Sequence, residues 1–181
     1  MPGKLSLPAI VPVTTDAHRA EARELIAEYL HWINESAQRE YGLNFDVNAM
    51  IAADLADGTK FQPPFGRFYV VHDGTAAIAV GCLKRLNEQV GEVQRMYVRA
   101  SQRGKGVGRL IVDRLIADAR EIGYRTLRLE SLKFLAVAHA LYRSVGFVEI
   151  IPYAGNSMEN YHVPDLAPAY RASVLFMELA L

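Results

Sequence analysis

Residues 102–108 read Gln-Arg-Gly-Lys-Gly-Val-Gly, and they precede a strongly amphipathic stretch, residues 107–122, that predicts a helix. Three alternating glycines let the backbone turn and bring its N–H groups close to a ligand. The first N–H groups of the helix have no partner within it, and its dipole is positive at that end. Arg103, Lys105 and Arg109 add three cations. The stretch therefore predicts an anion site that suits a diphosphate.

Two common phosphate-binding motifs do not fit this stretch. The Walker loop consists of a glycine, four residues of any type, and then Gly-Lys followed by Ser or Thr. No such pattern is present in this stretch. The dinucleotide motif Gly-x-Gly-x-x-Gly fails because its last position falls on Arg109 or Ile111. Nucleotide hydrolysis and NAD binding therefore lose support. The alternative to an anion site at residues 102–108 is a turn that only connects a strand to a helix.

Hydrophobic periodicity divides the chain into an antiparallel meander followed by alternating strands and helices. The predicted helices are 17–40, 46–56, 107–122 and 134–145, and the predicted strands are 9–13, 67–72, 76–86, 91–99, 126–130, 147–153 and 173–180. Strict alternation along 91–99 puts Val93, Arg95 and Tyr97 on one face and Glu92, Gln94, Met96 and Val98 on the other. Residues 152–172, rich in Pro, Gly, Asn and Tyr, predict a long functional loop.

The composition excludes several classes of protein. A chain of 181 residues with 51% hydrophobic and 22% charged residues predicts one globular domain over 1–181. The net charge of zero argues against a nucleic-acid partner. The five histidines lack metal-ligand spacing, so no metal is expected, and Cys82 is the only cysteine and is expected to be buried. With no apolar run of about 18–20 residues and no secretory cleavage pattern, we expect no membrane partner and a cytoplasmic location.

Two motifs resemble one enzyme family. Residues 103–108, after the strand ending Arg-Met-Tyr-Val at 95–98, resemble the acetyl-CoA signature of the GNAT superfamily of N-acetyltransferases. Residues 141–147, Leu-Tyr-Arg-Ser-Val-Gly-Phe, are similar to the final motif of that family. The resemblance implies an α/β (α+β) fold with a mixed, mostly antiparallel sheet and helices on both faces. It also implies that the sheet splays open between the strand ending at Val98 and the strand 126–130.

The same resemblance implies how acetyl-CoA, the acyl donor, is held. The pantetheine arm would pair with the backbone of Met96, Tyr97 and Val98 like an added strand. The diphosphate would lie on Arg103, Gly104, Lys105, Gly106, Val107, Gly108 and Arg109. The donor-binding core is then about 91–150, and the acceptor side is about 14–66 and 152–172. This chain departs from the family by lacking a proline at 99–101 and by having Leu135 where many members have asparagine.

Acyl transfer to an amine needs a proton acceptor for the amine and an acid for the leaving thiolate. The resemblance implies Tyr142 as the acid and Glu92 as the base, with the backbone N–H of Val98 or its neighbour stabilising the oxyanion. From the residues alone, Tyr142 is also explained as part of the helix stripe and Glu92 as a solvated strand residue. A water relay would leave Glu92 as a substrate anchor. Tyr153, Glu159, Tyr161, His162 and Asp165 are candidates to hold a cationic acceptor, and Trp32 is expected to pack within its helix.

The sequence therefore predicts an N-acetyltransferase that moves the acetyl group of acetyl-CoA directly to a primary amine of a small molecule or peptide. A non-catalytic acyl-CoA-binding module is the alternative from another class, and transfer to a hydroxyl or thioester hydrolysis is a third interpretation. The expected partners are acetyl-CoA and an amine acceptor. Because many members of the family dimerise, the resemblance also suggests a homodimer.

Overall fold

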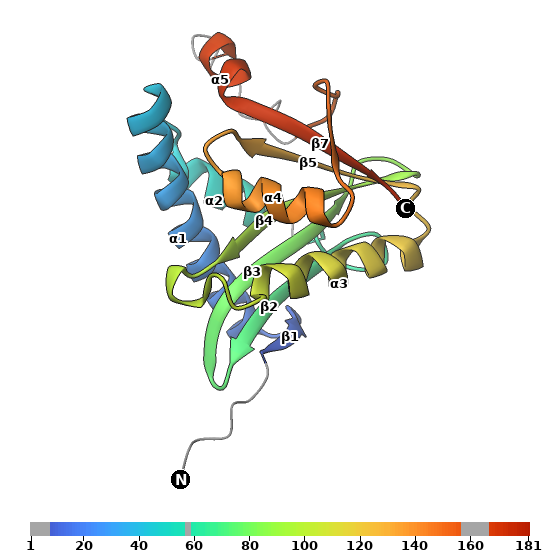
Figure 1. Ribbon diagram of the computed structural model, residues 1–181. Helices are drawn as coiled ribbons and strands as arrows, with labels where there is room; N and C mark the ends of the chain where they lie inside the picture. Colours follow the sequence, from blue (N-terminus) through green and yellow to red (C-terminus); the bar gives the residue numbers. More distant parts are fainter. Residues whose placement is uncertain (1–7, 57–58, 157–166) are drawn as a thin grey trace.

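The computed structural model describes residues 8–56, 59–156 and 167–181 (Figure 1). The strands are β1 (Ala9–Pro12), β2 (Arg67–Asp73), β3 (Ala76–Arg85), β4 (Val90–Val98), β5 (Thr126–Leu132), β6 (Val148–Ile150) and β7 (Val174–Ala180). Within the described residues they form one seven-stranded sheet in the order β1-β2-β3-β4-β5-β7-β6. Neighbouring strands are antiparallel except β4 and β5, which are parallel. The sheet is therefore mixed and mostly antiparallel, as predicted.

Helices cover both faces of this sheet (Figure 1). Helices α1 (Asp16–Tyr41) and α2 (Val47–Ala56) bury Leu25, Ile26 and Met50 against one face. Helices α3 (Val107–Ile122) and α4 (Ala136–Ser144) bury their apolar stripes against the other face. A short 3-10 helix, η1 (Ala100–Gln102), joins β4 to the glycine-rich loop, and α5 (Ala167–Ser173) leads into β7. This two-sided arrangement confirms the predicted fold class.

Short-range capping fixes where the first two helices begin. The Oγ1 atom of Thr15 accepts a hydrogen bond from the backbone N–H of His18 at 3.2 Å. Asp46 likewise accepts from the backbone N–H of Ala49 at 2.9 Å. Both are N-cap arrangements, in which a side-chain oxygen satisfies a helix N–H that lacks an intrahelical partner. The caps therefore set the start of the two helices that form one side of the site.

Strand β4 contains a one-residue bulge that interrupts its alternation. Gln94 lies opposite Cys82, but Tyr97 lies opposite Val80, so Arg95 and Met96 together face Gly81. Arg95 has a φ of +50°, in the left-handed region that non-glycine residues rarely adopt. The prediction of strict alternation along 91–99 is therefore wrong after Gln94. Met96 packs in the cluster around α3, whereas the Arg95 side chain turns to the side of α2.

The sheet opens between β4 and β5. These strands pair over Val90–Glu92 and Thr126–Arg128 alone, although β4 stays paired with β3 as far as Val98 and β5 stays paired with β7 as far as Leu132. Beyond the short pairing, the facing edges of the two strands diverge. The predicted splay is therefore confirmed.

The remaining differences lie at the ends of elements and in the C-terminal loop. Predicted and observed bounds agree within two residues for most elements, but the strand predicted at 147–153 is confined to Val148–Ile150. The predicted 152–172 loop is wrong at its end, where Ala167–Ser173 is helical. Glu159, Tyr161, His162 and Asp165 lie outside the described residues, so their predicted roles stay predictions.

Gly81 lies opposite the bulge and against Ile111 of α3. A Cβ at this position would lie 2.5 Å from Cγ2 of Ile111. We expect Gly81→Ala to lower the free energy of unfolding by about 1–3 kcal/mol, because overpacking forces neighbouring groups apart. In an Ile111→Ala background, which lacks that methyl, the same substitution should cost less. Denaturant unfolding of the four proteins in this double-mutant cycle measures the coupling. Equal costs in both backgrounds would contradict the steric explanation.

Candidate active site

A cleft of about 590 Å³ occupies the place where β4 and β5 diverge. Its walls come from five parts of the chain, namely α1, β4, the glycine-rich loop with the start of α3, β5, and the start of α4. The lining on β4 extends from Val93 to Val98, and the lining on β5 extends from Leu129 to Ser131. The divergence of the strands therefore gives the cleft its depth, and the helices close its sides.

The glycine-rich loop forms one end of the cleft. Gly104 and Gly106 have φ values of +75° and +82°, and a Cβ at either position would meet nothing within 4 Å. Glycine is therefore required by backbone conformation rather than by space. Gly106 is the N-cap of α3 and makes no side-chain capping bond, so the first N–H groups of the helix are not satisfied by a cap side chain. Because Gly104, Gly106 and Gly108 all line the cleft, the loop has the geometry of an anion site.

The three predicted cations lie around this loop. The Arg103 guanidinium lies 4.6 Å from the ring centroid of Trp32, and its Nε donates to the carbonyl oxygen of Val98 at 3.0 Å. Nε of Arg109 lies 2.8 Å from Asp113, and Nζ of Lys105 lies 3.0 Å from Oε1 of Gln102. Arg103 and Arg109 line the cleft, whereas Lys105 and the buried Val107 do not form part of its lining.

Trp32 takes a different position from the one expected. It lines the cleft and contacts Arg103, so it does more than pack within its helix. Its ring also lies 6.0 Å from that of Phe134, edge to face, and 6.3 Å from that of Tyr97. Such aromatic and cation–π contacts stabilise the wall by about 0.5–1.5 kcal/mol each. The first helix is therefore joined to the glycine-rich loop through Trp32.

Tyr142 lies on the floor of the cleft. Its side chain is 6% exposed, its ring packs on Phe147, and its hydroxyl lies 3.7 Å from Sδ of Met96, on the strand predicted to hold the donor arm. Burial raises the pKa of the Tyr142 hydroxyl well above its usual value, with a smaller contribution from Tyr29. The hydroxyl therefore stays protonated at neutral pH and can donate a hydrogen bond.

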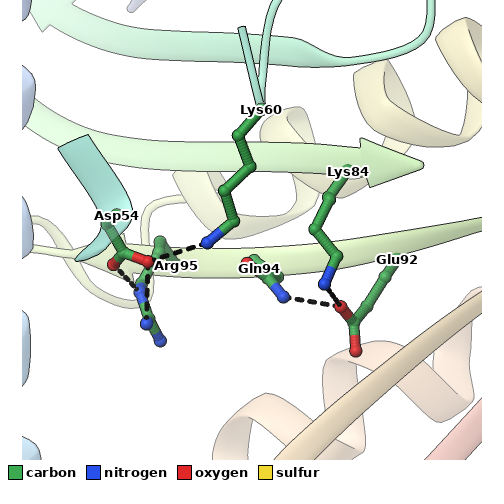
Figure 2. A network of polar contacts seen from close by, with 6 residues as sticks. All are labelled: Asp54, Lys60, Lys84, Glu92, Gln94 and Arg95. Carbon is green, nitrogen blue, oxygen red and sulfur yellow. Dashed lines mark hydrogen bonds and ion pairs between the residues drawn. The ribbon is translucent and has the colours of Figure 1, made fainter. Parts of the chain in front are cut away.

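Glu92 lies beneath the cleft rather than in its lining. Its side chain is fully buried, and its Oε2 lies 3.1 Å from Nζ of Lys84 and 2.5 Å from Nε2 of Gln94 (Figure 2). The Tyr153 hydroxyl donates to Oε1 at 2.8 Å. Tyr153 has a raised pKa, first because of burial and then because of the neighbouring Glu92. Glu92 is thus not a solvated strand residue but the centre of a buried polar network that reaches the cleft through Gln94.

Several charged and polar residues of the cleft were not predicted. Arg95, Glu130 and Tyr29 line it, and the buried Asp54 of α2 pairs with Arg95. The sequence offered one indication of this group, because an arginine within a strand is seldom buried unless it has a partner. The partner Asp54 lies 41 residues away, and no local pattern connects the two.

Neither membrane-spanning helices nor metal sites are found among the described residues. In the parts of the chain that the structure describes, no helix is long and apolar enough to cross a membrane. Among the same residues, no three His, Cys, Asp or Glu side chains are arranged to hold a metal ion. Cys82 is buried as expected, and burial raises its pKa well above the usual value, so the thiol is unreactive at neutral pH.

Comparison with known proteins identifies the family to which the chain belongs. Residues 26–147 match the acetyltransferase (GNAT) family. An uncharacterized N-acetyltransferase of Schizosaccharomyces pombe is 30% identical over 163 residues, which are 88% of this chain and 92% of that protein. One from Dictyostelium discoideum is 40% identical over 72 residues, so that match spans 40% of this chain but only 33% of the relative's length.

Solved structures show the same fold. An acetyltransferase from Streptococcus agalactiae superposes with a TM-score of 0.70 at 16% identity, covering 96% of this chain and 98% of that one. A protein from Salmonella typhimurium, solved with its cofactor acetyl-CoA, superposes with a TM-score of 0.62 at 17% identity. The match covers 97% of this chain and 95% of that one. The family match over residues 26–147 and the S. pombe relative make the chain an acyltransferase. It belongs to the GNAT family of acetyltransferases.

The loop geometry leads to a first binding prediction. We expect Gly106→Asp to abolish binding of coenzyme A, because the substitution strains a φ of +82° and sets a carboxylate against the diphosphate. Isothermal titration with coenzyme A measures the loss. Gly74→Asp is the matched control, since Gly74 also has a positive φ of +62° and open space but lies in the hairpin between β2 and β3. Normal binding by Gly106→Asp, or equal loss in the control, would contradict the assignment.

Proposed function

We propose that the enzyme transfers the acetyl group of acetyl-CoA directly to a primary amine of a small molecule. The observation that carries this proposal is the placement of three features in one cleft. These are the positive-φ loop, the edge of β4 without β5 beside it, and the Tyr142 hydroxyl. The presence of acetyl-CoA in a structural neighbour supports the choice of donor.

The donor would lie along β4 and the loop. Its diphosphate would accept hydrogen bonds from the N–H groups of residues 103–108, and its pantetheine arm would pair with the β4 edge at Met96, Tyr97 and Val98. All three of these residues line the cleft. Leu135, which stands at the N-cap of α4 without a side-chain capping bond, also lines it. An apolar contact at this position would replace the polar contact that asparagine makes in many members of the family.

Transfer would proceed by attack of the amine nitrogen on the thioester carbonyl. The C–N bond forms, the C–S bond breaks, and Tyr142 gives its proton to the departing thiolate. A backbone N–H near Val98 would stabilise the oxyanion before the thiolate leaves. The Tyr142 hydroxyl lies beside Met96, so a donor arm on the same strand would bring the thioester sulfur to it.

The amine must lose a proton to react. An amine with a pKa of about 10.4 is neutral in only about one molecule in 2,500 at pH 7, and selecting that form costs about 4.6 kcal/mol. Among the residues that the structure describes, Glu92 and Glu130 are the candidate acceptors of this proton. Glu92 would have to act through Gln94 and water, because it does not line the cleft, whereas Glu130 lines the cleft directly. We therefore assign the first proton transfer to Glu130, and the base role of Glu92 stays a prediction.

Release of free thiol from acetyl-CoA tests the proposed function. Thiol should appear only when an amine is added. Release without an amine would indicate hydrolysis, and release with alcohols but not amines would indicate transfer to a hydroxyl. Binding of acetyl-CoA without release under any of these conditions would favour a non-catalytic binding module.

Tyr142→Phe tests the acid. We expect kcat to fall about 100-fold, at the lower end of the range for general acid catalysis, because a thiolate with a pKa near 8.5 is a fairly good leaving group. The affinity for acetyl-CoA should stay unchanged in titrations. Tyr124→Phe is the matched control, since that buried hydroxyl donates to the Phe65 carbonyl at 2.6 Å and does not line the cleft. Full turnover in Tyr142→Phe would remove this residue from the mechanism.

A further inference from the structure

Gln94 presents a buried hydrogen-bond acceptor to the cleft. The residue is 6% exposed and lines the cleft from β4. Its Oε1 has no hydrogen-bond partner among the described residues. A buried acceptor that lacks a partner costs free energy, and native proteins contain few such groups. An oxygen left unpaired at the wall of the cleft therefore indicates a ligand that donates a hydrogen bond to it.

The orientation of this amide is fixed by Glu92. Nε2 of Gln94 donates to Oε2 of Glu92 at 2.5 Å, and Nζ of Lys84 lies 3.1 Å from the same oxygen (Figure 2). The Tyr153 hydroxyl donates to Oε1 of Glu92 at 2.8 Å. In the reversed orientation, Oε1 of Gln94 would face a carboxylate oxygen, and two acceptors with no hydrogen between them repel. The amide oxygen, and not the nitrogen, is therefore the atom left for a ligand.

Gln94 and the proposed acid lie on opposite faces of the sheet. Gln94 lies opposite Cys82 in the β3–β4 register, and Cys82 belongs to the cluster formed with α1 and α2. Tyr142 belongs to the cluster formed with α3, and Met96 packs against that cluster. The cleft between the diverging strands is lined by Gln94, Met96 and Tyr142 alike. An amine on Gln94 would thus approach the thioester from one face, while the thiolate leaves toward Tyr142 on the other.

The chemistry of the transfer determines which N–H can stay on Gln94. A neutral primary amine has one lone pair and two N–H bonds. The lone pair forms the C–N bond to the acetyl carbon, and one N–H loses its proton to the proton acceptor of the site. The C–S bond breaks, and the thiolate takes a proton from Tyr142. The second N–H remains in the product amide, so its hydrogen bond to Oε1 can persist from substrate to product.

This hydrogen bond strengthens as the reaction proceeds. The amine nitrogen gains positive charge while it attacks the carbonyl, before its proton is lost, and a charged nitrogen is the stronger donor. An interaction that is stronger in the transition state than in the bound substrate raises kcat. A carboxamide oxygen accepts hydrogen bonds and is too weakly basic to take the proton. Gln94 therefore orients the amine without deprotonating it.

We propose that Gln94 selects primary amines as acceptors, because its Oε1 receives the N–H that the nitrogen keeps through the transfer. This inference rests on the proposed acetyl transfer and names the residue that determines its acceptor class. A secondary amine has a single N–H, and an alcohol has a single O–H. Each loses that hydrogen in the transfer and leaves Oε1 without a partner. Gln94 thus discriminates against both classes.

Matched pairs of amines test the inference. Each primary amine is compared with its N-methyl derivative, and kcat/KM for both is measured by thiol release. We expect the ratio of the two values to fall about 10- to 100-fold in Gln94→Met, which is the effect of one hydrogen bond to a charged group. Most of the loss should be in kcat for the primary amine. Methionine has nearly the volume of glutamine, so steric hindrance by the added methyl group cancels in the comparison.

The same comparison separates the two ends of the amide. Gln94→Met also removes the bond from Nε2 to Glu92, but that loss affects both amines equally and leaves their ratio unchanged. Gln94→Leu removes the same oxygen and serves in the event that Gln94→Met fails to fold. Gln89→Met is the matched control, because Gln89 is exposed between β3 and β4 and does not line the cleft. Affinity for coenzyme A in titrations should be unchanged in all three variants.

The outcomes distinguish this inference from the function on which it rests. A ratio that stays the same in Gln94→Met, whether both amines lose activity equally or neither does, would overturn the role of Gln94 and leave acetyl transfer standing. A loss of coenzyme A affinity in that variant would assign Gln94 to the donor and overturn the inference as well. Absence of thiol release with every amine would overturn acetyl transfer itself, and the inference with it.

Discussion

Strands β4 and β5 share only a three-residue parallel ladder, and the cleft exists because that ladder stops at Glu92 and Arg128. Each strand is held past that point by its other neighbour, β4 by β3 and β5 by β7. The diverging edges therefore stay in strand conformation without pairing to one another. A β4 edge in this state can pair with an extended ligand, and such main-chain pairing contributes affinity without demanding particular side chains. The glycine-rich loop follows after η1, so in the proposed function one strand would lead the donor from its thioester to its diphosphate.

The buried polar groups beneath the cleft cost free energy of desolvation, and their arrangement indicates that they orient side chains of the cleft. Two sets lie side by side in Figure 2, Asp54 with Arg95 and Lys60, and Glu92 with Lys84 and Gln94. Buried ion pairs rarely stabilise a fold more than apolar residues of similar size would, because desolvation offsets the Coulomb attraction. Each set, however, fixes one group that lines the cleft, Arg95 in the first and Gln94 in the second. Their contribution is thus better understood as orientation than as stability.

The sequence predicted the glycine-rich loop and its helix better than the charged wall across the cleft, because the loop is a local pattern and the wall is assembled from residues far apart in the chain. The loop at 102–108 and the helix at 107–122 are local patterns, and local conformation was enough to predict them. The charged wall across the cleft is assembled from α1, α2, β4 and β5, and the pairing of Arg95 with Asp54 spans 41 residues. The bulge also made the predicted alternation along 91–99 wrong after Gln94, because one extra residue moves every following side chain to the other face. The sequence singled out Glu92 as a strand glutamate. Its burial, however, depends on contacts with Lys84 and Tyr153, and no local sequence pattern predicts that these residues meet Glu92.

The bulge also divides the side chains of β4 between the two faces of the sheet. Arg95 pairs with Asp54 of α2, whereas Met96, the next residue, packs toward α3 and contacts the Tyr142 hydroxyl. In a regular strand Arg95 and Gln94 would point to opposite faces of the sheet. The left-handed residue puts both on the same side and leaves Met96 beside the proposed acid. One distorted residue therefore decides which side chains of β4 line the cleft, and Gly81, opposite the bulge, leaves room for Ile111 of α3.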